Sequence, residues 1–194
     1  MYPLWLLIGY LCGSIPFAVI IARARGVDIF KMGSGNPGAT NVMRSVGKNE
    51  GRLCFALDAL KGYAPVFIAL AYTHTPALAA AALVGALLGH SFSVWINFRG
   101  GKGVATTVGG LLALVPGVML VGLLLWLVVF FLFRYVSLAS IIMAVWLPFG
   151  AWILNVDIVS FWIVTAVGVL VILRHKANIE RLLTGTENRF SKKP

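Results

Sequence analysis

A long apolar run, VATTVGGLLALVPGVMLVGLLLWLVVFFLF, occupies residues 104–133. As one straight helix it would be about 45 Å long, whereas the hydrocarbon core of a bilayer is ~30 Å thick. Pro116 and Gly117 lie near its middle, where an α-helix kinks or stops. We therefore predict two helices, residues 104–115 and 116–133, joined at Pro116.

The positions of the basic residues also favour dividing this run. Membrane proteins concentrate Lys and Arg in their cytoplasmic loops. A single crossing would place Arg134 and the C-terminal cations outside, whereas two crossings place them inside with the other loop cations. The C-terminal cations are Arg174, Lys176, Arg181, Arg189, Lys192 and Lys193. Seven transmembrane helices follow, with the N-terminus outside and the C-terminus cytoplasmic: 3–22, 53–72, 77–95, 104–115, 116–133, 137–154 and 158–173.

The composition of the whole chain indicates an integral membrane protein. Of 194 residues, 60% are hydrophobic and only 11% are charged, and the mean hydropathy is +0.93. The apolar runs are continuous rather than alternating, which favours an all-α fold over a barrel. No internal repeat is visible, so we predict a single transmembrane domain across residues 1–194.

The net charge of +10 is largely explained by the bias of cations toward cytoplasmic loops. No basic stripe alternates with exposed aromatic residues, so we expect no nucleic-acid partner. Cys12 and Cys54 lie in or beside apolar runs without metal or redox spacing. The three His are scattered and acidic residues are few, so we predict no metal site.

A polar, glycine-rich segment, GSGNPGATNVMR, occupies residues 33–44 and is predicted to be cytoplasmic. Ser34 or Asn36 can cap a helix, Pro37 suits its first position, and Gly47 can end it. The N-terminus of a helix attracts anions through unpaired N–H groups and the helix dipole. With Arg44 two turns along, this segment predicts a phosphate site.

Two other interpretations of the same segment have to be considered. Gly33, Gly35 and Gly38 also match the dinucleotide-binding pattern G-x-G-x-x-G. That pattern requires a preceding strand within a βαβ unit, and here Pro37 interrupts it, so a Rossmann site is disfavoured. A flexible polar loop without a ligand remains an alternative.

A second glycine-rich segment, residues 97–106, precedes the short helix 104–115. Its core, Gly100-Gly101-Lys102-Gly103, offers backbone N–H groups and one ammonium group to a phosphate. It is not a Walker A motif, because Ile96 replaces the leading Gly and Gly103 replaces Ser or Thr. Close helix packing through small residues is the alternative.

Two further polar features of the sequence have to be considered. Asp58 and Lys61 lie one turn apart in the second span, which favours a structural ion pair over chemistry. In the third cytoplasmic segment, residues 174–188, His175 and Asn178 share a helix face. His175 could be a base, a phosphate donor or an interfacial residue, and the spacing does not decide between these roles.

Taken together, three motifs resemble those of the bacterial acyl-phosphate-dependent glycerol-3-phosphate acyltransferases. They are residues 34–41 with Arg44, His90 with residues 100–106, and His175 with Asn178 and Glu187. Their order and the chain length also agree with that family. One departure is Ser93, where we expect Pro.

The resemblance implies roles for individual residues. Ser34, Arg44, Lys102 and His175 are expected to be catalytic, and Glu187 is expected to maintain the structure. The expected substrate- and phosphate-binding residues are Gly35, Asn36, Gly38, Thr40, Asn41, His90, Gly100, Gly101, Gly103 and Asn178.

It also implies a reaction and a location. Acyl phosphate would donate a fatty acyl group to the 1-hydroxyl of glycerol 3-phosphate, without an acyl-enzyme or a cofactor, giving lysophosphatidic acid and phosphate. The enzyme would be monomeric and multi-pass in the bacterial cytoplasmic (inner) membrane, with its active site facing the cytoplasm. A transporter of phosphate or a phospho-ester, and a structural membrane subunit, are the alternatives; a transporter would show internal symmetry, and a subunit would not need three glycine–cation segments.

Overall fold

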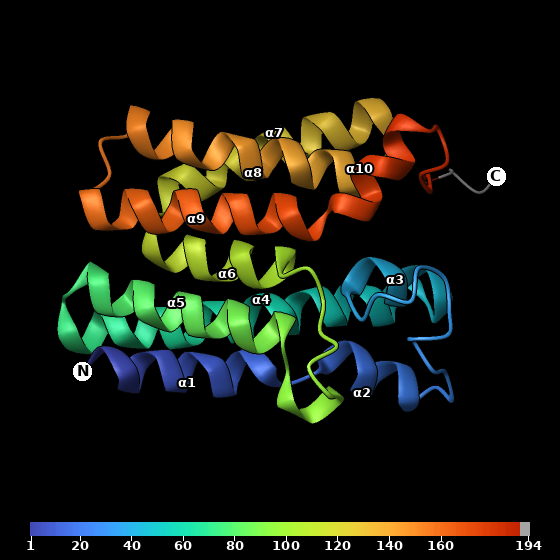
Figure 1. Ribbon diagram of the computed structural model, residues 1–194, viewed down its shortest axis with the longest axis horizontal. Coiled ribbons are helices and arrows are strands. Elements are labelled where there is room, and N and C mark those ends of the chain that lie inside the picture. Colours follow the sequence, from blue (N-terminus) through green and yellow to red (C-terminus); the bar gives the residue numbers. More distant parts are fainter. Residues whose placement is uncertain (191–194) are drawn as a thin grey trace. The chain divides into compact units, whose positions relative to one another are not determined.

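The computed structural model describes residues 1–190, and its regular elements are all helices (Figure 1). The chain divides into two compact units, Met1–Leu114 and Val115–Pro194. The single domain across residues 1–194 stays a prediction. Unit 1 contains α1 (Tyr2–Ser14), α2 (Phe17–Arg23), α3 (Ala39–Ser45), α4 (Lys48–Thr73), α5 (Pro76–Ser91), η1 (Val94–Ile96) and α6 (Val104–Leu114). Unit 2 contains α7 (Pro116–Phe133), α8 (Val136–Ile153), α9 (Ile158–Arg174) and α10 (Lys176–Leu183).

The lengths and hydropathy of these helices confirm an all-α membrane protein. Within the described residues, five segments are long and apolar enough to cross a bilayer: Tyr2–Arg23, Lys48–Thr73, Pro76–Ile96, Pro116–Phe133 and Val136–Ile153. Helices α9 and α10 would form a sixth span that bends by 56°. Helix α6 is apolar but shorter. The count of seven spans and their orientation therefore stay predictions.

The chain breaks where the long apolar run predicted a break. Val115 has φ −138° and ψ 66°, outside the helical region, and α7 begins at Pro116. Pro suits the first position of a helix because it has no N–H group to leave unpaired. Two helices joined at Pro116 are thus confirmed.

A second proline breaks the first span, which the sequence predicted to be one helix over residues 3–22. Ile15 is extended, with φ −59° and ψ 117°, and separates α1 from α2. Pro16 causes this break, because a residue that precedes proline is driven out of the helical region. The Ile15 carbonyl is left without a helical partner, and Lys61 Nζ donates a hydrogen bond to it at 2.8 Å.

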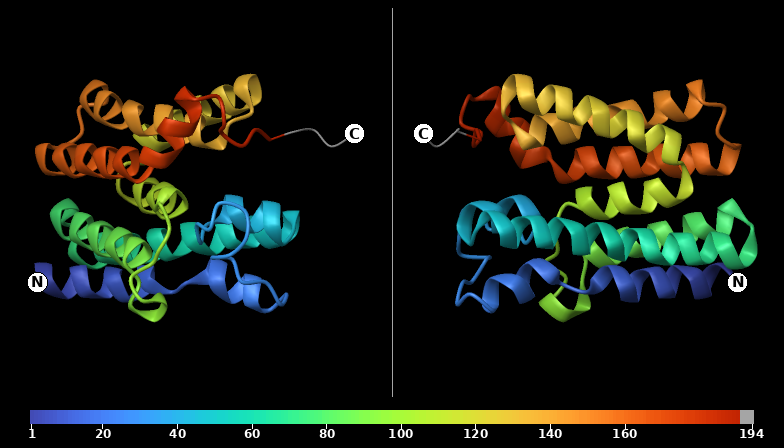
Figure 2. Two further views of the ribbon diagram at one scale, coloured as in Figure 1. Left: turned by 45° about the vertical axis from the view of Figure 1, so that its right-hand side comes forward. Right: turned by 180° about the vertical axis from the view of Figure 1, so that it is seen from behind.

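Glycines allow the helices of unit 1 to pack at close range, as between α1 and α5 in both views of Figure 2. A Cβ atom added to Gly9 or Gly13 of α1 would collide with the backbone of α5, and one added to Gly85 would collide with that of α1. Helices α4 and α6 meet in the same way at Gly62 and Gly109. Small residues serve this purpose in membrane proteins, where apolar side chains gain little by leaving lipid.

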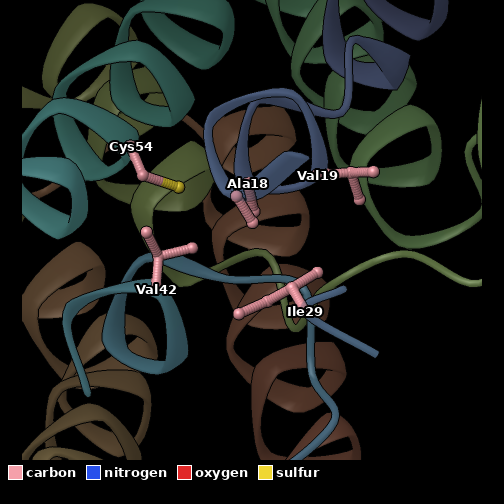
Figure 3. Close-up of a cluster of buried hydrophobic side chains, with 6 residues drawn as sticks. Ala18, Val19, Ile29, Val42 and Cys54 are labelled. Atoms are coloured by element: carbon pink, nitrogen blue, oxygen red, sulfur yellow. The ribbon is translucent and has the colours of Figure 1, made fainter. Parts of the chain in front are cut away.

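A compact apolar cluster packs α2, α3 and α4 of unit 1 against one another (Figure 3). Ala18 and Val19 of α2 pack with Ile29, Val42 of α3 and Cys54 of α4. Ile29 belongs to the irregular segment that joins α2 to α3. The cluster therefore anchors the connection that contains the first glycine motif.

Tryptophans link the helices of unit 2. Trp146 Nε1 of α8 donates to the carbonyl of Val118 in α7 at 2.9 Å, and Trp126 Nε1 of α7 donates to Ser140 Oγ in α8 at 3.1 Å. Helix α9 packs on α8, and its N-cap is Asp157, whose carboxylate accepts from the Ser160 N–H at 3.0 Å. Indole N–H groups within apolar helices need such acceptors.

Candidate active site

The first glycine motif forms a loop that ends in the short helix α3. Gly33 and Gly35 have φ of +58° and +67°, a region that glycine enters at low cost. The expected cap was wrong: α3 begins at Ala39 with Gly38 as its N-cap and no capping side chain. The N–H of Gly38 instead bonds to the Asn36 carbonyl at 2.9 Å, so residues 36–38 form a tight turn ahead of the helix.

Gly47 terminates this helix, as the sequence predicted. Helix α3 ends at Ser45, and the Gly47 N–H bonds back to the Val42 carbonyl at 3.1 Å. Gly47 is the N-cap of α4 as well. One residue thus closes α3 and opens the next helix, which places α3 directly beside the start of α4.

Asn41 holds the first loop in shape. Its Nδ2 donates to the carbonyls of Met32 at 2.9 Å and Ile29 at 3.3 Å, and its Oδ1 accepts from the Ser34 N–H at 3.1 Å. The side chain is buried. These bonds give the Asn41 amide a positioning role in the loop, and its contact with a phosphate stays a prediction.

The second glycine motif crosses the end of α5 before α6 begins. The N–H groups of Gly100 and Gly101 donate to the carbonyls of Ser91 and His90, each at 3.1 Å. Gly103 has φ +82°, and its carbonyl accepts the Thr107 N–H at 2.7 Å in the first turn of α6. The expected glycine loop leading into a helix is confirmed.

The two glycine loops lie against each other. A Cβ atom on Gly101 would sit 3.1 Å from the Pro37 carbonyl oxygen, and the same cavity is lined by both residues. Arg99 reinforces this contact, because its guanidinium stacks 4.8 Å from the centroid of the Phe30 ring. Two segments about 60 residues apart in the sequence thus meet in the folded chain.

Side chains of the required chemistry are accessible on these loops. Ser34 and Arg44 are exposed, while Asn36, Thr40 and Lys102 are half-buried. Arg44 lies in the last turn of α3, and Lys102 immediately precedes Gly103 and α6. Accessible cations of this kind suit a phosphate ester, because hydrogen bonds between charged groups are the strong ones.

The unexpected Ser93 has a clear structural partner. Its hydroxyl donates to the Ser14 carbonyl at 2.5 Å, and Trp95 Nε1 donates to Ser14 Oγ at 3.0 Å. These bonds tie the segment after α5 to the end of α1, close to the break at Pro16. Ser93 therefore fixes the path of the chain between His90 and the second glycine loop.

The third motif lies in unit 2, where Glu187 collects three donors. Its Oε1 accepts from Asn178 Nδ2 at 2.7 Å and from Ser137 Oγ at 2.8 Å, and its Oε2 accepts from Arg181 Nε at 2.7 Å. Ser137 was missed by sequence reasoning, because nothing in its spacing connects the start of α8 to residue 187. The network supports a structural role for Glu187.

His175 lies at the bend between α9 and α10. It is buried, and its Nδ1 lies 2.7 Å from the Val171 carbonyl. A carbonyl oxygen only accepts, so Nδ1 must carry a proton, and in a neutral ring Nε2 is then the basic nitrogen. This geometry is compatible with a base or a donor and does not choose between them.

The network predicts acid-dependent stability of the C-terminal segment. Burial raises the pKa of Glu187, but the bonds from Asn178, Ser137 and Arg181 outweigh it and hold the pKa below its ordinary value. The stabilisation is therefore complete above the ordinary glutamate pKa and is lost as the pH falls through the lowered one. We expect Glu187→Gln to melt about 3 °C or more below wild type at pH 7, since hydrogen bonds to charged groups contribute roughly 1.5–3 kcal/mol.

Thermal unfolding in detergent across pH 7 to pH 3 measures this effect. The difference between wild type and Glu187→Gln should shrink toward the acid end. The exposed Glu180→Gln, on the same helix as Arg181, is the matched control. A difference that stays constant with pH would show that the charge of Glu187 does not stabilise the segment.

In this helical membrane protein, two glycine loops meet beside accessible cations. This arrangement is typical of membrane proteins that bind phosphorylated ligands. The glycerol-3-phosphate acyltransferase family model matches residues 3–185. A glycerol-3-phosphate acyltransferase of Mesorhizobium japonicum is 46% identical over 189 residues, covering 97% of this chain and 95% of the relative. One from Aquifex aeolicus is 43% identical over 192 residues, covering 98% and 100%.

Solved structures agree with these relatives. The crystal structure of PlsY (YgiH), an integral membrane glycerol 3-phosphate acyltransferase, in its glycerol 3-phosphate form is 41% identical. The match has a TM-score of 0.94 and covers 98% of this chain and 96% of that one. The lysophosphatidic acid form matches with a TM-score of 0.92. The chain belongs to the glycerol-3-phosphate acyltransferase family.

Proposed function

We propose that this enzyme transfers a fatty acyl group from acyl phosphate to the 1-hydroxyl of sn-glycerol 3-phosphate. The products are lysophosphatidic acid and inorganic phosphate. The observation that carries the proposal is the contact between two glycine loops beside Ser34, Arg44 and Lys102. The glycerol 3-phosphate and lysophosphatidic acid forms of PlsY support the choice of acceptor and product.

The two loops suit this reaction because both substrates are phosphate anions. The loop at residues 100–103 would receive glycerol 3-phosphate, with Lys102 and the N-terminus of α6 opposite its charge. Ser34 and Arg44 of the first motif would hold the acyl phosphate. Placing two anions side by side converts a bimolecular encounter into a reaction between fixed neighbours.

Direct transfer needs no covalent enzyme intermediate. The 1-hydroxyl oxygen attacks the acyl carbonyl carbon, a new C–O ester bond forms, and the bond from that carbon to the phosphate oxygen breaks. The leaving phosphate takes the hydroxyl proton, and a role for His175 as a base stays a prediction. Cations beside the phosphates stabilise the charge that develops on the leaving group.

A donor comparison tests the reaction. Purified protein in lipid nanodiscs is supplied with radiolabelled glycerol 3-phosphate and one of three donors: acyl phosphate, acyl-coenzyme A or acyl carrier protein. We expect lysophosphatidic acid only with acyl phosphate, and an unchanged rate with a metal chelator. Product from acyl-coenzyme A, or none from acyl phosphate, would refute the proposed donor.

We further propose a multi-pass, monomeric enzyme in the bacterial cytoplasmic membrane, with seven spans and an active site facing the cytoplasm. The break between α6 and α7 supports this topology, because it permits two crossings within residues 104–133. A cysteine placed at Gly117 should then react with an impermeant reagent from outside, and one at Arg134 only from inside. Native Cys12 and Cys54 are replaced by Ala in both. Labelling of the Arg134 position from outside would show that residues 104–133 cross the membrane only once, which would contradict the seven-span topology.

A further inference from the structure

A buried charged cluster in unit 1 lies next to the second glycine loop. Asp58, Lys61 and His90 are exposed by only 2%, 6% and 7%. Lys61 Nζ lies 2.7 Å from Asp58 Oδ1, and His90 Nδ1 lies 3.8 Å from the same oxygen. The pairing of Asp58 with Lys61 that the sequence predicted is confirmed, whereas the approach of His90 to it was not foreseen.

Charges buried in a membrane protein are expensive, and replacing a buried ion pair by apolar groups is often neutral or stabilising. Stability alone is therefore a weak reason for this cluster. Its contacts outside the pair are more informative, because they reach two irregular parts of the chain. Lys61 binds the carbonyl of Ile15 at the proline break, and His90 reaches the glycine loop.

His90 connects the ion pair to that loop. Its Nδ1 side faces the Asp58 carboxylate. Its Nε2 side packs so closely on Gly101 that a Cβ atom there would collide with it. The His90 carbonyl also accepts the Gly101 N–H at 3.1 Å. The imidazole thus lies between a fixed carboxylate and the backbone of the loop that carries Lys102.

We propose that Asp58 and Lys61 are positioning residues that fix the Gly100–Gly103 loop through His90. Asp58 sets the position of the His90 ring, and Lys61 sets that of Asp58 while holding the proline break of the first span. Because the His90 ring packs on Gly101, an error in the ring position shifts the Gly100–Gly103 loop and weakens its binding of glycerol 3-phosphate. The inference rests on the proposed function in taking glycerol 3-phosphate as the ligand of this loop.

Removing both charges separates positioning from folding. In Asp58→Asn/Lys61→Met no unpaired charge stays buried, so the protein should melt within a few degrees of wild type. We expect KM for glycerol 3-phosphate to rise at least about tenfold, with kcat and the KM for acyl phosphate changing less than about threefold. The milder Asp58→Glu keeps the ion pair but shifts the carboxylate, and should raise the same KM about threefold.

The exposed pair Asp28 and Lys31, with the same i,i+3 spacing and an Nζ–Oδ2 distance of 3.7 Å, supplies the matched control. Asp28→Asn/Lys31→Met should leave every kinetic constant unchanged. Wild-type KM for glycerol 3-phosphate in both Asp58 variants would overturn the inference, whether or not the double variant melts early. So would a fall in kcat with unchanged KM.

A binding measurement distinguishes this failure from failure of the proposed donor. Isothermal titration of wild type and Asp58→Glu with glycerol 3-phosphate alone needs no acyl donor. The inference predicts a weaker Kd in Asp58→Glu by about threefold, even if wild type proves inactive with acyl phosphate. Equal Kd values would overturn the inference without contradicting the proposed acyl-transfer reaction.

Discussion

Lys102→Ala and Arg44→Ala are each expected to lower kcat/KM at least about 100-fold without unfolding the protein. A charge-assisted contact to phosphate is worth roughly 1.5–3 kcal/mol in the ground state, and more where charge develops during the reaction. Lys102 precedes α6 at the meeting point of the two loops, and Arg44 lies exposed on α3. Neither side chain belongs to the buried core, so truncation should leave the fold intact.

The exchange Arg44→Lys should remain badly impaired, because an ammonium group does not reproduce the bidentate fork of a guanidinium. Steady-state kinetics in nanodiscs, together with thermal unfolding, measures both effects. Lys31→Ala and Arg52→Ala are the matched controls, since both are exposed cations outside the glycine loops. Wild-type turnover in either Lys102→Ala or Arg44→Ala would remove that residue from the site.

Gly101→Ala is expected to raise KM for glycerol 3-phosphate at least about tenfold. The added methyl group would collide with the His90 imidazole and crowd the Pro37 carbonyl. Backbone on one side and a buried ring on the other leave little room to relax, and overpacking of this kind typically costs 1–3 kcal/mol. The Gly100–Gly103 loop must therefore move away from the His90 ring and from Pro37.

The matched control for Gly101→Ala is Gly26→Asn. Gly26 has φ +72°, but a Cβ atom there meets no atom within 4 Å, and Asn tolerates this backbone region better than other side chains. Its kinetic constants should equal those of wild type. If Gly101→Ala also behaved as wild type, the close contact between the two loops would have no role in binding.

Local signals predicted much of this fold. The position of Pro116 correctly predicted where the long apolar run divides. The spacing of Asp58 and Lys61 correctly predicted an ion pair, because residues one turn apart share a helix face. The same reasoning missed Pro16, which lies inside a run that is predominantly apolar. It also misplaced the start of α3, because Pro37 joined a turn closed by the Gly38 N–H rather than the first turn of the helix.

The site was harder to predict where it depends on distant pairing. Glycines beside cations marked both loops, yet no spacing indicated that Gly101 would meet Pro37 or that Ser137 would meet Glu187. Asn41 was expected at the ligand because it belongs to a polar motif, and that expectation stays a prediction; its hydrogen bonds within the loop had no signal in the sequence. Such contacts are set by helix packing, which a local pattern does not encode.

Direct acyl transfer at the meeting point of the two glycine loops is tested by one measurement. Ser34, the exposed hydroxyl of the first motif, is the candidate nucleophile for an acyl-enzyme. The enzyme is incubated with acyl phosphate alone, the reaction is quenched, and the mass of the intact protein is measured by mass spectrometry. Glycerol 3-phosphate is added to a parallel sample that is not quenched. Direct transfer predicts an unchanged mass followed by rapid formation of lysophosphatidic acid. A stoichiometric acyl adduct on Ser34, consumed when glycerol 3-phosphate is added, would contradict it.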